Sequence, residues 1–313
     1  MPIDAAAIGS AAALLRSGRL VAFPTETVYG LGANALDAAA VARIYAVKGR
    51  PATSPLIVHV SSIDMAKSLV ETWPESAERL TQEFWPGPLT IVLEKKPLIP
   101  PIVTAGLSTV GLRMPDHPIA LALIKAAGIP LAAPSANRFT QLSPTTAAHV
   151  RDGLGSGAQM ILDGGPCTVG IESTVVSLAA AKPVLLRPGG ISRIEIESMI
   201  GPVGAASDSA EGAHASPGMH PRHYSPLAKL ILVVNGELPS QGKGIYLWRE
   251  NPPSRPEVDT IRMPASAADY AASLYDALHR ADTHGRDWIA VELPPSTSDW
   301  EAVRDRLRRA AFR

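Results

Sequence analysis

The sequence predicts an α/β protein with a large first domain, a linker and a smaller second domain. Short apolar runs typical of strands alternate with helical patterns along most of the chain, which favours a sheet covered by helices. A length of 313 residues exceeds what one ordinary core needs and suits two domains. Residues 201–227 change to Gly, Ala, Ser, Pro and His without periodicity, so we expect the linker there.

The first elements are a helix, a strand and a second helix. Residues 5–17 have an amphipathic helical pattern closed by Gly18, and residues 19–23 follow as an apolar strand. Pro24 has no N–H for a sheet ladder, so the strand should end there and release a polar loop. Asp37 then caps the next helix.

The rest of the first domain, residues 1–200, repeats this alternation. Further strands are predicted at 56–60, 89–93, 109–114, 129–133, 160–162, 173–178 and 184–187. Helices are predicted at 75–84, 116–127, 143–151 and 192–200. Asp116 and Ser143 are residue types that cap helices, and Pro144 suits a first helical position.

The second domain, residues 228–313, shows the same alternation on a smaller scale, and we expect a Rossmann-like α/β unit. Strands are predicted at 229–234, 244–248 and 288–293, and helices at 266–281 and 299–311. The last helix carries four arginines, Arg304, Arg306, Arg308 and Arg309. They could touch RNA, but such a run is more typical of a solvated helix face.

Charge and composition argue against several classes of protein. The 29 basic and 29 acidic side chains cancel, which gives no bulk attraction to nucleic acid or membrane. No apolar run approaches the ~20 residues that span a bilayer, and the first residues lack a signal-peptide pattern. The single cysteine, Cys167, excludes an internal disulfide framework and suits a buried or loop thiol in a reducing compartment. We therefore expect a cytoplasmic enzyme.

Polar side chains concentrate around the end of the first strand. Residues 23–30 read Phe-Pro-Thr-Glu-Thr-Val-Tyr-Gly, and Lys48 and Arg50 follow at the end of the next helix. Two further cations, Arg113 and Arg187, end strands beside Pro. Ligands bind at the carboxyl edge of an α/β sheet, so we expect these segments to form one basic cleft there. Such a cleft suits a small polar substrate held beside phosphates.

Other binding motifs do not fit the sequence. It contains no G-x-x-x-x-G-K-[ST] phosphate loop. Residues 30–35 and 153–158 match G-x-G-x-x-A, but neither stands between a strand and a helix, so we do not expect NAD. His220 and His223 are only two ligands in a linker, so we expect no metal held by the protein.

The polar loop and its surroundings resemble the YrdC/Sua5 family of threonylcarbamoyl-AMP synthases. The family's Pro-Thr-Glu-Thr-x-Tyr-Gly loop matches residues 24–30, and its Lys-x-Arg and Ser-x-Asn signatures match Lys48, Arg50, Ser135 and Asn137. Further matching segments are 54–56, 85–90, 111–115, 133–137, 171–176 and 186–189. The resemblance implies a YrdC-like twisted mixed sheet with helices, followed by the C-terminal domain of the Sua5 type.

The reaction that this resemblance implies joins L-threonine, bicarbonate and ATP into L-threonylcarbamoyladenylate with release of pyrophosphate. The product would serve threonylcarbamoylation of tRNA adenosine 37, so tRNA or the downstream threonylcarbamoyl transferase would be further partners. Mg²⁺ would be carried by the triphosphate. Positioning and charge neutralisation can carry such a reaction, so no nucleophilic Ser or Cys is needed.

The resemblance also assigns residues to each substrate. L-Threonine would be bound by Thr27, His59, Arg113, Ala133 and Ser173. ATP would be bound by Arg50, Ser54, Thr109, Ser135, Ser143, Arg187 and Tyr224. The signature residues, which we expect to serve catalysis, are Lys48, Arg50, Ser135 and Asn137.

The end of the linker differs in character from its start. Residues 217–226 contain three prolines, so we expect a stiff segment that folds over the ATP site as a lid. Relatives often have Lys where this chain has His220, and a neutral His weakens any pairing of that position with phosphate.

Two alternatives remain open. A basic cleft would also suit an RNA-binding module without catalysis, although the zero net charge counts against it. An ATP-dependent carbamoyl-transfer domain, of the kind joined to hydrogenase maturation proteins, shares this fold. That domain normally comes with acylphosphatase and zinc-finger segments, and this chain has one cysteine.

Overall fold

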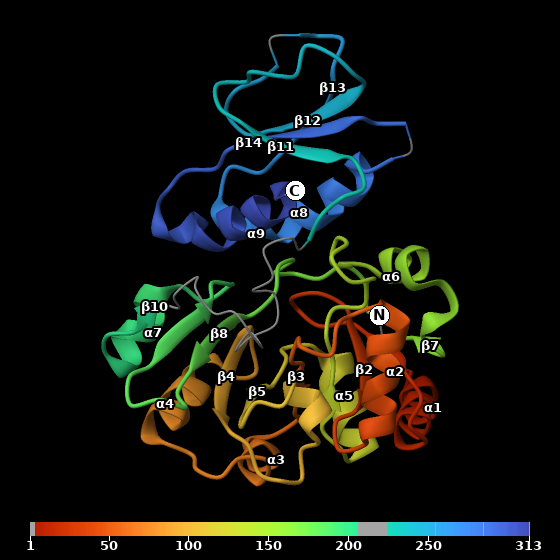
Figure 1. The fold of residues 1–313 in the computed structure, drawn as a ribbon, viewed down its shortest axis with the longest axis vertical. Coiled ribbons are helices and arrows are strands. Elements are labelled where there is room, and N and C mark those ends of the chain that lie inside the picture. The colour runs from red at the N-terminus through yellow and green to blue at the C-terminus, as the bar shows by residue number, and fades with distance from the viewer. Residues whose placement is uncertain (1–3, 206–223, 254, 284, 313) are drawn as a thin grey trace.

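The computed structural model describes residues 4–205, 224–253, 255–283 and 285–312. Within these ranges the chain forms a ten-stranded sheet and a four-stranded sheet. Figure 1 shows them in two bodies, with the larger sheet in the lower one and the smaller sheet in the upper one. No helix in these ranges is long and apolar enough to cross a membrane.

The larger sheet contains β1 (Val21–Phe23), β2 (Gly30–Asn34), β3 (Ile57–His59), β4 (Leu89–Glu94), β5 (Thr109–Arg113), β6 (Leu131–Ala132), β7 (Met160–Ile161), β8 (Thr174–Ser177), β9 (Val184–Arg187) and β10 (Gly204–Ala205). Their order across the sheet is β10-β9-β8-β4-β5-β3-β6-β2-β1-β7. β3 pairs with β5 and β4 with β8 in parallel, whereas β4 pairs with β5 and β1 with β2 antiparallel. The predicted mixed sheet is therefore confirmed.

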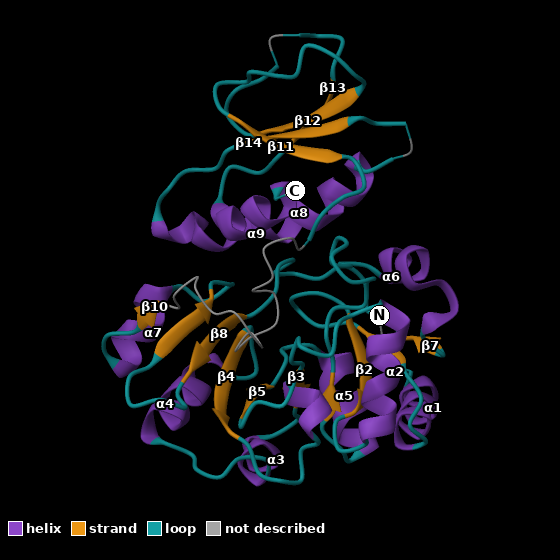
Figure 2. Ribbon diagram, in the orientation of Figure 1, coloured by secondary structure: helices purple, strands orange, loops and turns teal. Residues whose placement is uncertain are grey.

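The helices of the lower body are α1 (Ala5–Arg16), α2 (Ala38–Lys48), α3 (Ile63–Ser68), α4 (Glu75–Phe84), α5 (Pro118–Ala127), α6 (Ala147–Leu154) and α7 (Arg193–Ile200). Successive residues of a strand face opposite sides of a sheet, and the core divides accordingly. Val21 and Phe23 join the apolar cluster of α1 and α5, whereas Leu20 and Ala22 join the larger cluster that contains α2 and α4. Helices therefore cover both faces, as an α/β sheet requires (Figure 2).

The upper body has a parallel sheet and two long helices. Its elements are β11 (Lys229–Val233), β12 (Gly244–Trp248), β13 (Asp259–Arg262), α8 (Ala267–Ala281), β14 (Trp288–Glu292) and α9 (Glu301–Ala311). The strands lie in the order β11-β14-β12-β13, and every pair is parallel. In Figure 2 both helices lie between this sheet and the lower body.

The two bodies share an apolar cluster. Val28, Leu142 and Ile171 of the lower body belong to the same buried cluster as Leu274 and Tyr275 of α8. Burying apolar surface stabilises this contact by about 25 cal/mol per Å². The helices of the upper body therefore pack directly onto the lower body, and the linker is not the sole connection between them.

Four elements had no counterpart in the sequence prediction: β2, α3, β10 and β13. β2 reads Gly-Leu-Gly-Ala-Asn, which has low strand propensity. Its glycines make room for the ring of Phe23, because a Cβ at Gly32 would lie 2.8 Å from that ring. The first G-x-G-x-x-A match thus falls on a strand and has a packing role.

Two predicted helix starts were wrong. The N-cap before α5 is His117 rather than Asp116, and its Nδ1 accepts the N–H of Ile119. The N-cap before α6 is Thr146, whereas Ser143 lies three residues earlier and donates its hydroxyl to Glu172 at 2.6 Å. Both proposed caps had the right residue type. In the linker, residues 204–205 form β10, and residues 206–223 lie outside the described ranges.

Candidate active site

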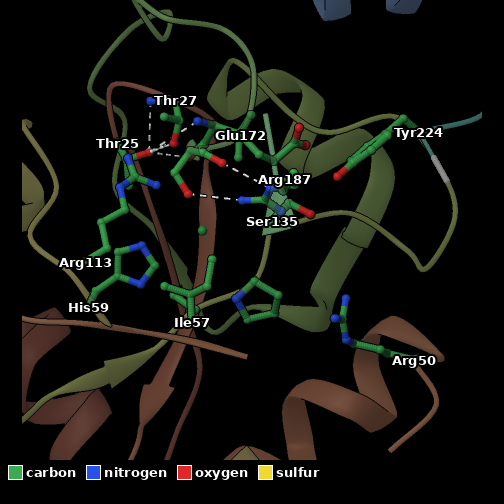
Figure 3. A pocket seen from close by; sticks show the side chains of 15 residues that line it. Thr25, Thr27, Arg50, Ile57, His59, Arg113, Ser135, Glu172, Arg187 and Tyr224 are labelled. Atoms are coloured by element: carbon green, nitrogen blue, oxygen red, sulfur yellow. Dashed lines mark hydrogen bonds between the residues drawn. The ribbon is translucent and has the colours of Figure 1, made fainter. Parts of the chain in front are cut away.

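One cavity is lined by residues from most of the strand ends at which we predicted substrate-binding residues. Its volume is about 550 Å³ including the part open to solvent. It is lined by Thr25, Thr27, Val28, Gly30, Arg50, Ile57, His59, Arg113, Ala133, Pro134, Ser135, Glu172, Ser173, Arg187 and Tyr224. In Figure 3, Arg113 and His59 lie at one end of this set and Arg50 and Tyr224 at the other.

The cavity lies over one face of the sheet rather than only at its edge. Ile57 and His59 share a face of β3, and Arg113 shares it because it pairs with His59 in the β3–β5 register. Val58 and Leu112 point to the opposite face and are fully buried in the core. The cavity is therefore not confined to one edge of the sheet, as we had expected. Because some strand pairs are antiparallel, its lining includes both first and last residues of strands, such as Gly30 of β2 and Arg113 of β5.

The loop after β1 presents two hydroxyl groups in a fixed arrangement. Thr25 Oγ1 donates to the carbonyl of Val28 at 2.7 Å and lies 2.8 Å from Thr27 Oγ1. Since the Thr25 hydrogen is used on Val28, the hydroxyl of Thr27 donates to Thr25. Thr27 Oγ1 then keeps lone pairs that can accept a hydrogen bond from an amine or hydroxyl in the cavity.

Arg113 is held by a carboxylate within the same body. Its Nη2 lies 2.7 Å from Glu26 Oε1, and both side chains are 5% exposed. Nε also donates to the carbonyl of Gly87 at 3.3 Å. A guanidinium has five N–H donors, so donors remain for a second carboxylate in the cavity. Glu26 balances the buried charge of Arg113.

His59 forms a neutral part of the cavity wall. Burial and the nearby charge of Arg113 lower the pKa of His59 to about 3. Its ring meets Phe23 edge to face at 6.2 Å, and its Nδ1 has no hydrogen-bond partner among the described residues. A neutral imidazole with an open ring nitrogen can hydrogen-bond to a polar substrate without adding charge.

The other end of the cavity is cationic. Arg50 donates to the carbonyl of Pro55 at 3.0 Å, and Arg187 donates from Nε to the carbonyl of Ser173 and from Nη2 to its hydroxyl, at 3.0 and 3.1 Å. Burial lowers the pKa of Arg50 to about 10 and also lowers the pKa of Arg187. Arg50 therefore remains charged at neutral pH, and two guanidinium groups can face an anion.

Lys48 does not line the cavity. Its Nζ donates to the carbonyl of Ser135 at 2.6 Å and to the carbonyl of Asn137, and burial followed by the charge of Arg50 lowers the pKa of Lys48 well below its usual value. Asn137 donates in turn to the carbonyls of Arg138 and Gln141. Lys48 and Asn137 thus lie behind Ser135 and tie α2 to the loop that carries it.

The remaining predicted residues lie near the cavity but not in its lining. The carbonyl of Ser54 accepts from Nε of Arg50 at 3.4 Å. Ser143 is fully buried and donates to Glu172. Thr109 lines a neighbouring cavity of about 290 Å³ that shares Ile57 with the larger one. Tyr224, which belongs to the lid predicted at 217–226, lines the main cavity. Residues 217–223 of that segment lie outside the described residues.

Sequence reasoning missed Glu172 and misjudged Arg306. Glu172 lines the cavity and forms a buried ion pair with Arg306 of α9, with Nε and Oε2 2.7 Å apart. The expectation that the arginines of the last helix form a solvated face is therefore wrong for Arg306, whose side chain is 1% exposed, whereas Arg308 is exposed. Glu172 lies within segment 171–176, which matches the family pattern. That match was the signal in the sequence that could have identified Glu172 as a site residue.

Cys167 is a buried thiol, as predicted, and burial raises its pKa to about 12. A thiol with so high a pKa is a poor nucleophile. The chemistry of the cavity therefore rests on hydroxyl groups, a neutral imidazole and charged groups.

Fold and cavity together define an α/β protein with a polar cavity that can accept an amine or hydroxyl at one end and an anion at the other. A family model described as telomere recombination, which covers Sua5, YciO and YrdC proteins, matches residues 13–189. A model described as the C-terminal domain of threonylcarbamoyl-AMP synthase matches residues 191–312. The chain belongs to the Sua5 family of threonylcarbamoyl-AMP synthases.

Individual relatives agree over nearly the whole length. The threonylcarbamoyl-AMP synthase of Bacillus subtilis (strain 168) is 46% identical and covers 97% of this chain and 92% of its own length. The crystal structure of Pyrococcus abyssi Sua5 complexed with L-threonine is similar with a TM-score of 0.93 at 41% identity, covering 99% of this chain and 96% of that one. Both relatives include the upper body.

One solved structure bears on the carbamoyl-transfer alternative. Full-length HypF in a phosphate- and nucleotide-bound form matches 60% of this chain and 29% of its own, with a TM-score of 0.51 and 24% identity. This likeness shows a common fold alone. The match of both bodies to the synthases favours the synthase reading over the carbamoyl-transfer domain.

Proposed function

We propose that this enzyme makes L-threonylcarbamoyladenylate from L-threonine, bicarbonate and ATP, releases pyrophosphate, and thereby supplies threonylcarbamoylation of tRNA adenosine 37. The observation that carries the proposal is the placement of three buried arginines around one cavity, with Arg113 beside the paired hydroxyls of Thr25 and Thr27 at one end and Arg50 at the other. Arg187 is the third arginine of the lining. Two anionic groups, a carboxylate and a triphosphate, match these charges.

L-Threonine binds at the Arg113 end. Arg113 takes its carboxylate, since Glu26 leaves guanidinium donors free, and Thr27 accepts from its amine. His59, Ala133 and Ser173 complete the pocket. The P. abyssi structure that carries L-threonine supports this assignment through its similarity over both bodies.

ATP binds at the other end, where Arg50 and Arg187 face the phosphates and Ser135 and Tyr224 line the wall. Ser54 and Ser143 serve this end indirectly, because Ser54 holds Arg50 and Ser143 holds Glu172. Thr109 contributes from the neighbouring cavity. The signature residues Lys48 and Asn137 act by holding the loop of Ser135.

The chemistry needs positioning more than covalent help. The threonine amine attacks the carbon of bicarbonate, and the adduct loses the bicarbonate hydroxyl as water to give a carbamate. A carbamate oxygen then attacks the α-phosphorus, and the bond to pyrophosphate breaks. Fixing the reactants side by side can lower the barrier by up to ~7–11 kcal/mol, and the buried guanidinium groups stabilise charge on the phosphates.

A divalent cation fits this cavity only as part of the nucleotide. The single carboxylate in the lining, Glu172, is already paired with Arg306, so the described lining offers no free cluster of acidic ligands. Mg²⁺ therefore arrives on the triphosphate and supplies charge neutralisation there.

The division of the chain follows from these roles. Residues 1–200 form the catalytic domain, residues 201–227 the linker and lid, and residues 228–313 a C-terminal domain that covers the ATP end. We assign the enzyme to the cytoplasm, with tRNA or the downstream transferase as the recipient of its product.

Labelled bicarbonate tests the proposal. Incubated with ATP and L-threonine, the protein should place the label in an adenylate and release pyrophosphate, and omission of either L-threonine or bicarbonate should stop both. Tight RNA binding without such release would replace the proposal by the RNA-binding alternative.

A further inference from the structure

Resting on the proposed function, we infer that Arg306 of the C-terminal domain is a positioning residue for the ATP end of the active site. It neutralises the carboxylate of Glu172, which otherwise faces the anionic nucleotide, and it holds the ring of Tyr224. The second domain thereby influences the affinity for ATP much more than the affinity for L-threonine.

Arg306 cannot itself reach a substrate. Its Nε binds Glu172 Oε2 at 2.7 Å, Nη1 binds Asp305 at 2.8 Å, and Nη2 donates to the carbonyls of Glu172 and Pro188 at 3.3 and 3.0 Å. Every nitrogen of the guanidinium is engaged, and the side chain is 1% exposed. Arg306 therefore acts on the cavity through Glu172.

Glu172 connects α9 and α8 to the cavity wall. Ser143 donates to its Oε1 at 2.6 Å, and Tyr275 of α8 donates at 3.1 Å to Oε2. Burial raises the pKa of Glu172, but the charges of Arg306 and Arg187 outweigh it, so the carboxyl stays ionised. Its neighbour Ser173 accepts two hydrogen bonds from Arg187. A shift of Glu172 would thus also disturb the guanidinium that faces the phosphates.

Tyr224 is held between the same two helices of the C-terminal domain. The guanidinium carbon of Arg306 lies 5.4 Å from the Tyr224 ring centroid, in cation–π range. The ring of Tyr275 lies 5.8 Å away on a tilted plane. Since Tyr224 lines the cavity, one arginine controls two parts of the wall at the ATP end.

The charges explain why the pairing matters. Among the described residues that line the cavity, Glu172 is the one carboxylate beside the arginines that would bind triphosphate. With Arg306 present, that carboxylate is balanced. Without it, a buried negative charge faces the nucleotide, and burial keeps the repulsion strong because water screens it little.

The experiment measures the affinities for ATP and L-threonine, by calorimetry and as KM values, in the full-length protein. Arg306→Met keeps the length and apolar stem but removes the charge. It should weaken ATP binding about tenfold or more and change threonine binding less than about twofold. Arg308→Met, an exposed arginine on the same helix, is the matched control and should alter neither.

The double variant Glu172→Gln/Arg306→Met separates charge from structure. It removes the repelling carboxylate while the contact with α9 stays broken, so ATP affinity should return to within about threefold of the wild-type value. If it binds ATP as weakly as Arg306→Met, or if Arg306→Met weakens both substrates equally, Arg306 is merely structural and the inference is overturned.

Glu172→Gln alone keeps the test decisive should Arg306→Met fail to fold. It should bind ATP at least as well as the wild type, and a tenfold loss would contradict the role of charge. Calorimetry with ATP needs no turnover. A protein that binds ATP with this pattern yet forms no adenylate would refute the proposed reaction and leave the role of Arg306 standing.

Discussion

The two ends of the cavity balance their charges in different ways. At the threonine end, Arg113 is paired with Glu26, which comes from the loop after β1 in the same body. At the ATP end, Glu172 lies beside Arg187 and is paired with Arg306, which comes from α9 in the other body. One end is therefore complete within the catalytic domain, and the other is completed across the domain boundary.

This difference suggests how a second domain can influence an enzyme whose substrates it does not touch. A buried ion pair contributes little net stability, but loss of one partner leaves an uncompensated buried charge. Because Arg306 lies on the C-terminal domain, the charge balance at the ATP end depends on the position of that domain. The ion pair of the threonine end has both partners in the lower body, and the following predictions aim to separate the two ends.

The largest effect is expected from Arg113→Ala. Loss of the guanidinium removes the proposed partner of the threonine carboxylate and leaves Glu26 buried and without its ion-pair partner. We expect stability to fall by about 3–5 kcal/mol and threonine affinity to fall by at least tenfold, with ATP affinity nearly unchanged. Denaturant unfolding and separate substrate titrations measure these changes. Unchanged threonine affinity in a folded variant would refute the assignment of Arg113.

Arg50→Met and Arg187→Met should show the reverse pattern. Each loses the charge-assisted contact with phosphate that we propose, which should cost about 1.5–3 kcal/mol of ATP binding. Threonine affinity should change much less for Arg50→Met, because Arg50 lies at the far end of the cavity (Figure 3). Comparable losses for both substrates in the Arg50 variant would mean that the two ends are not separate.

The burial of His59 predicts a dependence of stability on pH. Its pKa is about 3 in the folded protein, against about 6.5 when exposed. Below pH 6.5 the unfolded chain takes up a proton that the folded chain does not, so folding stability falls by about 1.4 kcal/mol per pH unit as the pH drops toward 3. His59→Gln should lose stability less steeply over this range in urea unfolding, and parallel slopes would show that His59 does not contribute.

The smallest effect is expected for L-serine in place of L-threonine. Serine lacks the methyl group, whose burial in a fitted pocket is worth about 1 kcal/mol, so kcat/KM should be roughly fivefold lower. Competition between the two amino acids at fixed ATP concentration measures this ratio. Equal use of both would place the amino acid in a different part of the cavity.

The sequence predicted what depends on local chemistry. Strand ends beside proline located Arg113 and Arg187, and the residues around Pro24 and Pro134 lie in the cavity lining. The strand β2 was missed because its glycines have low strand propensity. They are there because a side chain at Gly32 would collide with the ring of Phe23 on the neighbouring strand. Ser143 resembled a helix cap until its distant partner Glu172 was known.

Long-range pairing is what the sequence could not show. Arg306 and Arg308 belong to one basic helix with the same local pattern, yet one is buried against a carboxylate 134 residues away and the other is exposed. Lys48 was expected in the cleft with the arginines, but its ammonium is used on backbone carbonyls. Which cation faces a ligand depends on tertiary partners rather than on spacing.

Two double-mutant cycles measure the difference between the ends most directly. One combines Glu26→Gln with Arg113→Met, the other Glu172→Gln with Arg306→Met, and each is measured for affinity toward both substrates. The account predicts a coupling of about 1 kcal/mol or more for threonine alone in the first cycle and for ATP alone in the second. Equal coupling to both substrates in the second cycle would contradict the claim that the C-terminal domain governs only the ATP end.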